Sequence, residues 1–360
     1  MLFAPGPVEM EKDICEIASL QSLPYFRGPR FAETVMRVNE DIKYLFQTNN
    51  IPLPITASGT GMMEMALTNL LNPGCKVVVI NGGSFGQKWV DMCRAFHINV
   101  LELRTELGKS PDMNLLRDML KSDIDALLVN MHETSTGYLY DIEEIGRLTN
   151  ERSILFIVDA VSSIGADVFR MDEWSVDCAM VSTQKALALL PGLGFIAFSK
   201  RALETIPKVN RNRYYFDALD YIKNMQRGMT PFTPAVISIL QVEARMKQIK
   251  IMGLDNWIKR HSDLANSFRK DLLSSNSDFS IFPERCSNAL TAVTLPEHVS
   301  ANSIIAYMRD KYDWWFAPNP TKNDSYLRIS HMGNLNEDVM KLVVARLIEA
   351  VYAIKKGDSA

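Results

Sequence analysis

Short apolar runs alternate with amphipathic segments between about residue 55 and residue 200. The runs are rich in β-branched and aromatic residues, which is typical of buried strands. They cover residues 76–81, 100–103, 126–130, 154–159, 178–182 and 194–198. Near-continuous apolar strands separated by helix-period segments predict an α/β fold with a mostly parallel sheet covered by helices on both faces. Ligands of such sheets bind at the carboxyl ends of the strands.

The pattern changes after Pro234, where a long helix-period segment runs to Met252 and closes at Gly253. A second helical segment covers 254–273, strand-like runs cover 290–295 and 326–330, and further helices are expected at 303–312 and 336–355. This order predicts a compact α+β unit. We therefore expect a large domain over residues 1–250 and a small C-terminal α+β domain over residues 251–360.

Composition narrows the function classes. The 360 residues are 47% hydrophobic and 22% charged, with a net charge of -3, so nothing favours nucleic acid or an acidic membrane surface as a partner. The five cysteines are scattered without a C-x-x-C pair or zinc-like spacing, so we expect no disulfide framework, no metal site and a reducing, cytoplasmic location. The start lacks the pattern of a signal peptide, and no apolar stretch approaches the ~20 residues of a membrane helix.

Two ionisable residues follow buried strands at the expected ligand edge. Lys185 lies just after the run 178–182, and Asp159 ends the run 154–159. A lysine in a dry crevice can be partly neutral and nucleophilic, and a nearby anion can hold a proton on a heteroaromatic nitrogen. A pyridoxal 5'-phosphate (PLP) enzyme needs these two groups most. The alternatives are a surface lysine that opens a helix and an aspartate with a purely structural partner.

A candidate phosphate seat precedes a helix-like segment, 62–71. In the sequence 57–61 (Ala-Ser-Gly-Thr-Gly), Ser58 and Thr60 would bring hydroxyls and free backbone N–H groups to the helix N-terminus. The alternative is ordinary helix capping. The sequence fits neither a Walker loop nor G-x-G-x-x-G.

Two further strand ends carry candidate ligand contacts. Phe85 lies in a glycine-rich turn after the run 76–81, where its ring could stack on a pyridine; the alternative is a core phenylalanine. Residues 132–137 (His-Glu-Thr-Ser-Thr-Gly) are too polar for the core of a sheet, so they either contact a ligand or form a solvated turn. We expect His132 itself to be a hydrogen-bonded strand-end histidine rather than a general base or metal ligand.

Taken together, the motifs resemble the class V aminotransferases of PLP-dependent fold type I, over essentially the whole chain. The nearest branch is that of alanine-glyoxylate (serine-pyruvate) and 2-aminoethylphosphonate-pyruvate transaminases. The ordered set is specific although no single motif is. The matching segments are Ala4–Pro7, Ser58–Thr60, His132–Gly137, Val158–Ser163, Ser182–Lys185 and Leu327–Ser330.

The resemblance implies a large domain with a mostly parallel seven-stranded sheet flanked by helices, plus a smaller C-terminal α+β domain. PLP would bind to the large domain, and the N-terminal segment 1–30 would contribute to the substrate site. Lys185 would form the Schiff base with the cofactor and later move a proton, while Asp159 would keep the pyridine nitrogen protonated.

The resemblance also assigns the other contacts, and it implies a homodimer with shared active sites. Arg328 would bind the substrate carboxylate, and Gly6 would line the substrate site. The remaining cofactor-binding residues would be Ser58, Gly59, Thr60 and Gln184 at the phosphate, Phe85 and Val161 on the two ring faces, Thr134 near the ring hydroxyl, and Thr233 from the partner subunit.

Two segments depart from the family pattern. Relatives carry Ser or Thr with His or Phe after the phosphate motif, where this chain has Gly61-Met62-Met63. The segment 25–30 (Tyr-Phe-Arg-Gly-Pro-Arg) has no simple counterpart in the alanine-glyoxylate enzymes. We hypothesise that Arg27 or Arg30 binds a second anion, such as a phosphonate or phosphate, on the amino donor.

The expected function is ping-pong transfer of an amino group from a small primary amine or amino acid to a 2-oxo acid, pyruvate or glyoxylate, with 2-aminoethylphosphonate among the candidate donors. One alternative is a PLP-dependent lyase of the cysteine desulfurase type, for which Cys286 is the candidate sulfur acceptor. Another is a non-catalytic binding protein with a degenerate PLP fold. Such proteins usually lose the lysine or the aspartate, and this chain keeps both.

Overall fold

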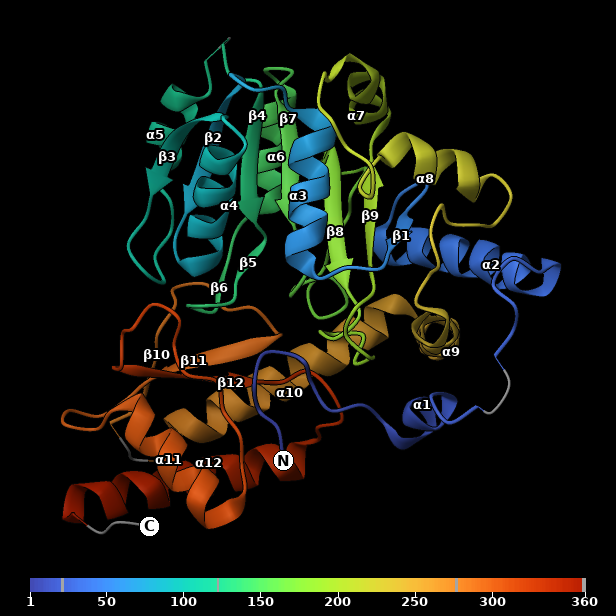
Figure 1. Cartoon of the computed structure of the whole chain (residues 1–360). Helices are drawn as coiled ribbons and strands as arrows, with labels where there is room; N and C mark the ends of the chain where they lie inside the picture. The colour runs from blue at the N-terminus through green and yellow to red at the C-terminus, as the bar shows by residue number, and fades with distance from the viewer. Residues whose placement is uncertain (21–22, 122, 276–277, 358–360) are drawn as a thin grey trace.

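A computed structural model describes residues 1–20, 23–121, 123–275 and 278–357. Its centre is a seven-stranded sheet in the order β1-β9-β8-β7-β4-β2-β3 (Figure 1). Neighbours from β3 to β8 are parallel, whereas β9 is antiparallel to β8 and β1 is antiparallel to β9. The strands are β1 (Leu53–Ile55), β2 (Lys76–Asn81), β3 (Asn99–Arg104), β4 (Ala126–Asn130), β7 (Leu155–Asp159), β8 (Cys178–Ser182) and β9 (Gly194–Phe198). The predicted mostly parallel α/β sheet is confirmed.

The sheet is buried because helices cover it on both sides. α3 (Gly59–Leu70) and α4 (Ser84–Ala95) pack on one face, and α6 (Ile142–Asn150) lies on the other (Figure 1). Every residue of β4, β7, β8 and β9 is buried, which explains why these strands read as unbroken apolar runs. Around them lie α1 (Lys12–Ile17), α2 (Pro29–Phe46), α5 (Met113–Met119), α7 (Lys200–Thr205), the 3-10 helix Ile206–Lys208 and α8 (Ala218–Met225).

β1 and α2 are among the elements that the sequence analysis did not predict. β1 has three residues and contains Pro54, which lacks the N–H of a regular strand; it is tolerated because β1 lies at the edge of the sheet. α2 is an amphipathic helix of 18 residues that begins at Pro29 and packs against α9 (Val236–Met252). A short hairpin, β5 (His132–Glu133) and β6 (Tyr138–Leu139), extends beyond β4.

The C-terminal part forms a second layer of structure below the central sheet (Figure 1). Its small antiparallel sheet contains β10 (Ser280–Ile281), β11 (Leu290–Thr294) and β12 (Tyr326–Ser330), and its helices are α10 (Leu254–Leu273), α11 (Ala301–Tyr312) and α12 (Glu337–Lys356). α9 ends at Gly253, whose φ of 85° suits glycine, as the sequence predicted.

The two largest hydrophobic clusters accompany these layers, and α10 contributes to both. Its first turns, with Trp257, join the large cluster, and its last turns, with Phe268, join the C-terminal cluster. Phe3 also packs in the C-terminal cluster, against Trp314 and Phe316. The domain boundary near residue 250 therefore stays a prediction. The first residues of the chain, with Phe3, pack with the C-terminal part.

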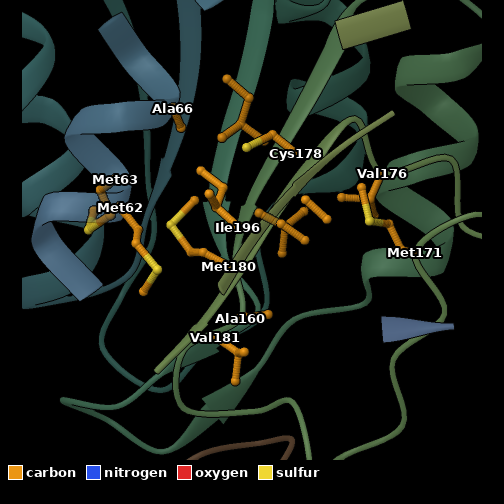
Figure 2. Close-up of a cluster of buried hydrophobic side chains, with 14 of the residues drawn as sticks. Met62, Met63, Ala66, Ala160, Met171, Val176, Cys178, Met180, Val181 and Ile196 are labelled. Carbon is orange, nitrogen blue, oxygen red and sulfur yellow. The ribbon is translucent and has the colours of Figure 1, made fainter. Parts of the chain in front are cut away.

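Methionines hold α3 against the sheet. Met62 and Met63 of α3 lie in the buried cluster that also contains Met180 of β8 and Ile196 of β9 (Figure 2). A Cβ at Gly194 would lie 2.7 Å from the Val181 carbonyl oxygen, as well as 2.2 Å from the Met62 methyl carbon, so glycine is required for this close packing. The unusual Met62-Met63 pair therefore fixes the N-terminus of α3 near the end of β8. In the part of the chain that the structure describes, no helix is long and apolar enough to cross a membrane.

Candidate active site

The parallel register brings the predicted chemical groups to one edge of the sheet. Asn130, the last residue of β4, pairs with Asp159, the last residue of β7, and Asp159 pairs with Met180 of β8. The segment that carries Lys185 begins directly after β8, so it leaves the sheet at the same edge as Asp159. The strand ends thus collect an amide, a carboxylate and a lysine, as expected for the ligand edge of a parallel sheet.

Lys185 lies beneath the N-terminal segment. Its Nζ donates a hydrogen bond to the carbonyl oxygen of Pro5, 2.7 Å away and 180 residues apart in sequence. A Cβ at Gly6 would lie 2.7–2.9 Å from the Cδ, Nζ and Cε atoms of Lys185, and the φ of Gly6 is +126°, so only glycine suits this position. Burial lowers the pKa of Lys185 to about 8, against the opposing charge of Asp159.

Asp159 is a fully buried carboxylate with two donors. Its oxygens accept hydrogen bonds from the Val161 backbone N–H at 2.9 Å and from Asn130 Nδ2 at 2.8 Å. Burial raises the pKa of Asp159 to about 6 although these donors and two lysines, Lys88 and Lys185, act to lower it. At neutral pH it is mainly an anion. The predicted need for a donor partner is confirmed.

The predicted phosphate seat is the N-terminus of α3, and Ser58 caps this helix as the helix-capping alternative expected. Ser58 is the N-cap, and its Oγ accepts from the Gly61 N–H at 3.4 Å; Ser58 and Thr60 are exposed. A Cβ at Gly59 would lie 3.1 Å from Val161 and 3.3 Å from the Ser182 Oγ, so glycine lets the helix start lie close to β8. This seat is therefore adjacent to the Asp159 and Lys185 strands.

Phe85 is half-buried in the first turn of α4, outside the buried core, so the core alternative is wrong. The start of this helix is capped by Glu133, whose carboxylate accepts from the backbone N–H groups of Phe85 at 3.3 Å and Gly86 at 2.9 Å. Burial raises the pKa of Glu133. The sequence marks Glu133 only as one polar residue in a cluster. Its capping role is not visible there, because its partners lie 47 and 48 residues earlier in the chain.

Residues 132–137 are all buried, so the alternative of a solvated turn is wrong. Thr134 Oγ1 lies 2.7 Å from the Ser162 hydroxyl, which in turn lies 3.0 Å from His132 Nδ1. Burial lowers the pKa of His132 to about 3, which keeps the imidazole neutral. His132 is thus the hydrogen-bonded strand-end histidine that the sequence predicted.

Arg328 of β12 connects the C-terminal layer to this edge. Its side chain is only 4% exposed, and it donates to Thr134 O at 3.1 Å, Pro318 O at 2.6 Å and Asn319 Oδ1 at 3.1 Å. Burial lowers its pKa, but the group stays cationic over the working pH range. Three anchors fix the direction of the guanidinium, which suits recognition of a planar carboxylate.

Three predicted residues lie outside this cluster. Thr233 is exposed between α8 and α9. Arg27 and Arg30 are also exposed, and the Arg27 guanidinium lies 4.9 Å from the Phe26 ring. The segment that leads into α2 lies at the side of the molecule, away from the carboxyl ends of the central strands (Figure 1). The hydrogen bonds of the described residues do not connect Thr233, Arg27 or Arg30 to Lys185, although the Ala235 N–H, close to Thr233, donates to the Thr56 hydroxyl at 3.1 Å.

Comparison with known proteins decides the family. Residues 21–311 match the family model of the class V aminotransferases, described as "Aminotransferase class-V". The chain belongs to the class V aminotransferase family. It is 31% identical to the L-aspartate–glyoxylate aminotransferase of Paracoccus denitrificans over 98% of this chain and 91% of that protein. It is 32% identical to the serine–glyoxylate aminotransferase of Arabidopsis thaliana, over 93% of this chain and 86% of that protein.

A solved structure agrees with the family assignment. The aspartate aminotransferase of subgroup IV from Thermus thermophilus matches with a TM-score of 0.89 and 27% identity, covering 98% of this chain and 99% of that one. This class V aminotransferase therefore has the PLP-dependent type I fold. The expectations of fold, enzyme class and PLP dependence are confirmed.

The residues at the strand ends of this class V aminotransferase fit PLP. Among the described residues, several buried side-chain atoms at this edge have no hydrogen-bond partner: Asn130 Oδ1, His132 Nε2, Ser182 Oγ and Gln184 Oε1. Buried polar atoms normally have partners, so an unpaired group of them at one edge favours a polar ligand there. The anion of Asp159, the lysine amine and the open helix N-terminus match the ring nitrogen, aldehyde and phosphate of PLP.

Proposed function

We propose that this aminotransferase moves an amino group from a small amine or amino acid to glyoxylate or pyruvate in a ping-pong reaction. The observation that carries the proposal is the connection between Lys185 and Arg328. Arg328 is anchored at the strand ends, where it donates to the Thr134 carbonyl oxygen, and the pKa of Lys185 is lowered mainly by burial, with a smaller contribution from the charge of Arg328. A nucleophilic amine and a carboxylate-binding cation thus serve the same small substrate. Both relatives named above carry glyoxylate in their names, which supports this acceptor.

Lys185 would hold the cofactor covalently and then act as the base. PLP, when bound, supplies an electron sink for the pair of electrons left at the substrate α-carbon. Since the pKa of Lys185 is about 8, a useful fraction of its amines is neutral near neutral pH and can remove the α-carbon proton. Asp159, held by Asn130 and Val161, would keep the pyridine nitrogen protonated.

The other predicted contacts complete the proposed site. Arg328 would bind the substrate carboxylate through its anchored fork, and Gly6 would leave room beside Lys185. The proposed cofactor contacts are Ser58, Gly59, Thr60 and Gln184 at the phosphate, Phe85 and Val161 on the ring faces, and Thr134 near the ring hydroxyl.

We further propose a cytoplasmic homodimer with shared sites. Thr233 would reach the partner's cofactor phosphate, and Arg27 or Arg30 would reach the partner's substrate site and bind a second anion. An exposed aromatic surface supports an interface near Thr233: Tyr214 is 83% exposed, and Tyr215 stacks on Phe232 with ring centroids 4.8 Å apart.

The test is the absorbance spectrum of the purified protein with PLP, followed by addition of serine, aspartate, alanine, 2-aminoethylphosphonate or a phosphorylated amino alcohol without an acceptor. A donor should remove the visible band, and glyoxylate or pyruvate should restore it. Arg27→Ala should weaken only donors that carry a second anion, with the exposed Arg117→Ala as its control. A band that no amine removes would contradict transamination by these donors.

Cysteine desulfuration is not supported. Cys286 is half-buried, its Sγ donates to Pro283 O at 3.9 Å, and its backbone bridges to Tyr138. Burial raises the pKa of Cys286, which makes its thiolate scarce at neutral pH. The same preparation should therefore release no sulfide from cysteine.

A further inference from the structure

A second lysine lies at the proposed cofactor site, and no motif drew attention to it. Lys88 is on α4, and its Nζ donates to the Thr60 hydroxyl at 3.1 Å. The same amine lies 4.9 Å from the centre of the Phe85 ring. Thr60 belongs to the proposed phosphate seat and Phe85 to the proposed ring contact, so Lys88 lies between the two.

The geometry of α4 fixes the position of Lys88 relative to Phe85. Phe85 and Lys88 are three residues apart, so they lie on the same face of the helix. The buried carboxylate of Glu133 fixes the start of α4 through the backbone of Phe85 and Gly86. A helix anchored in this way presents a ring and a cation together toward the N-terminus of α3.

The phosphate seat without Lys88 lacks a full positive charge. Ser58, Gly59, Thr60 and Gln184 offer only neutral donors, and a helix N-terminus contributes about half a unit of positive charge. A phosphate monoester carries about -1.5 to -2 at pH 7. A full cation beside Thr60 would balance most of the remaining charge.

The other nearby cations already have roles in the proposed site, whereas Lys88 is held by neutral groups, the Thr60 hydroxyl and the Phe85 ring. Arg328 is held by three protein oxygens, and Lys185 is the proposed covalent attachment point. Within the described ranges, Lys88 forms no ion pair with a carboxylate, although Arg94 on the same helix lies 3.8 Å from Asp91. The half-buried position of Lys88 also limits screening by water and salt.

We propose that Lys88 binds the phosphate of the cofactor and supplies the charge that the neutral seat lacks. This inference rests on the proposed function, because it takes the N-terminus of α3 as the phosphate seat. Lys88 is then a cofactor-binding residue from α4 that acts on the phosphate and not on the aldehyde.

The test compares PLP with pyridoxal, which has the same ring and aldehyde but no phosphate. Wild type, Lys88→Met, Lys88→Arg and the control Arg94→Met are each titrated with both compounds, and the dissociation constants are measured from the visible band and from quenching of tryptophan fluorescence. Lys88→Met should weaken PLP binding about tenfold, the usual scale of one charge-assisted hydrogen bond, and leave pyridoxal binding unchanged. Lys88→Arg should recover most of the loss, and Arg94→Met should match wild type.

Other outcomes overturn the proposal. Equal losses for PLP and pyridoxal would mean that Lys88 acts on the ring or on the fold, and no loss for either would mean a solvated side chain. Unchanged PLP affinity with a higher KM for anionic donors would make Lys88 a substrate residue. If Lys88→Met does not fold, Lys88→Arg and the salt dependence of wild-type binding decide: PLP binding should weaken with salt more than pyridoxal binding, and equal slopes would refute the pairing. If wild type itself shows no band with PLP, the proposed function fails first.

Discussion

Two aspartates in this enzyme are both buried but have different surroundings. Asp159 and Asp167 are both buried, and burial raises the pKa of each to about 6. Asp167 accepts from the Ser287 hydroxyl and from the Asn288 N–H at 2.8 Å, so it ties the loop after β7 to the C-terminal layer. Asp159 lies instead beside a lysine of lowered pKa and an amide oxygen without a partner.

The difference teaches that a perturbed pKa does not by itself identify a catalytic group. Both shifts have the same main cause, desolvation, and both carboxylates accept hydrogen bonds. What separates them is the state of their neighbours: around Asp167 the protein supplies the partners, whereas around Asp159 polar groups remain for a ligand.

The largest effect is expected from Lys185→Ala, which removes the covalent attachment and the base together. Turnover should fall by about a thousandfold or more, and the visible band with PLP should disappear. Far-UV circular dichroism should stay unchanged, and the exposed Lys200→Ala should behave as wild type. If Lys185→Ala kept its turnover, the site around Lys185 and Asp159 would not be the catalytic site.

The next test changes each aspartate to asparagine. Asp159→Asn should lower kcat by about a hundredfold or more, because a neutral amide does not hold a proton on the pyridine nitrogen. Asp167→Asn should leave kcat within about threefold of wild type, because the hydrogen bonds of the Asp167 carboxylate go to Ser287 and Asn288, away from the proposed cofactor contacts. Equal losses of kcat in the two variants would contradict the distinction between a catalytic Asp159 and a structural Asp167.

The stability of the same positions should follow the opposite order. Asp167→Ala leaves the Ser287 hydroxyl and the Asn288 N–H without their acceptor, so urea unfolding should show a free energy of unfolding lower by about 2 kcal/mol. Asp159→Ala also leaves two donors, Asn130 Nδ2 and the Val161 N–H, without their acceptor. It also removes a carboxylate that is costly to bury beside the unpaired Asn130 amide oxygen, so the free energy of unfolding should fall by less than in Asp167→Ala. A larger loss at Asp159 would give that residue a structural role.

The smallest effect concerns pH. The pKa of Lys185 is lowered to about 8. Below pH 8, the fraction of the neutral, reactive amine should therefore rise about tenfold for each unit by which the pH is raised, and above pH 8 it should level off. The rate at which the protein captures PLP, followed by stopped-flow absorbance between pH 6 and pH 10, should show this bend. A rate that keeps rising toward pH 10.5 would mean that the lysine is solvated like an ordinary one.

The sequence by itself determined the strands and what stands at their ends. β2, β4, β8 and β9 have the predicted bounds, because each is an unbroken apolar run between polar or glycine-containing segments. Asp159 ends such a run and Lys185 lies just past another, and a charged group at the end of a buried strand is expensive to bury and therefore informative. The short edge strand β1 left no such signal.

Tertiary structure alone decided which distant groups meet. Pro5 and Gly6 cover Lys185 from 180 residues away, Glu133 caps the helix that carries Phe85, and Lys88 reaches the hydroxyl of Thr60. Local sequence patterns report burial and periodicity, which depend on neighbouring residues, whereas these contacts depend on sheet order and on how α3, α4 and the N-terminal segment pack around it. That is the physical reason why the strand-end residues could be predicted and the residues that hold and charge the site could not.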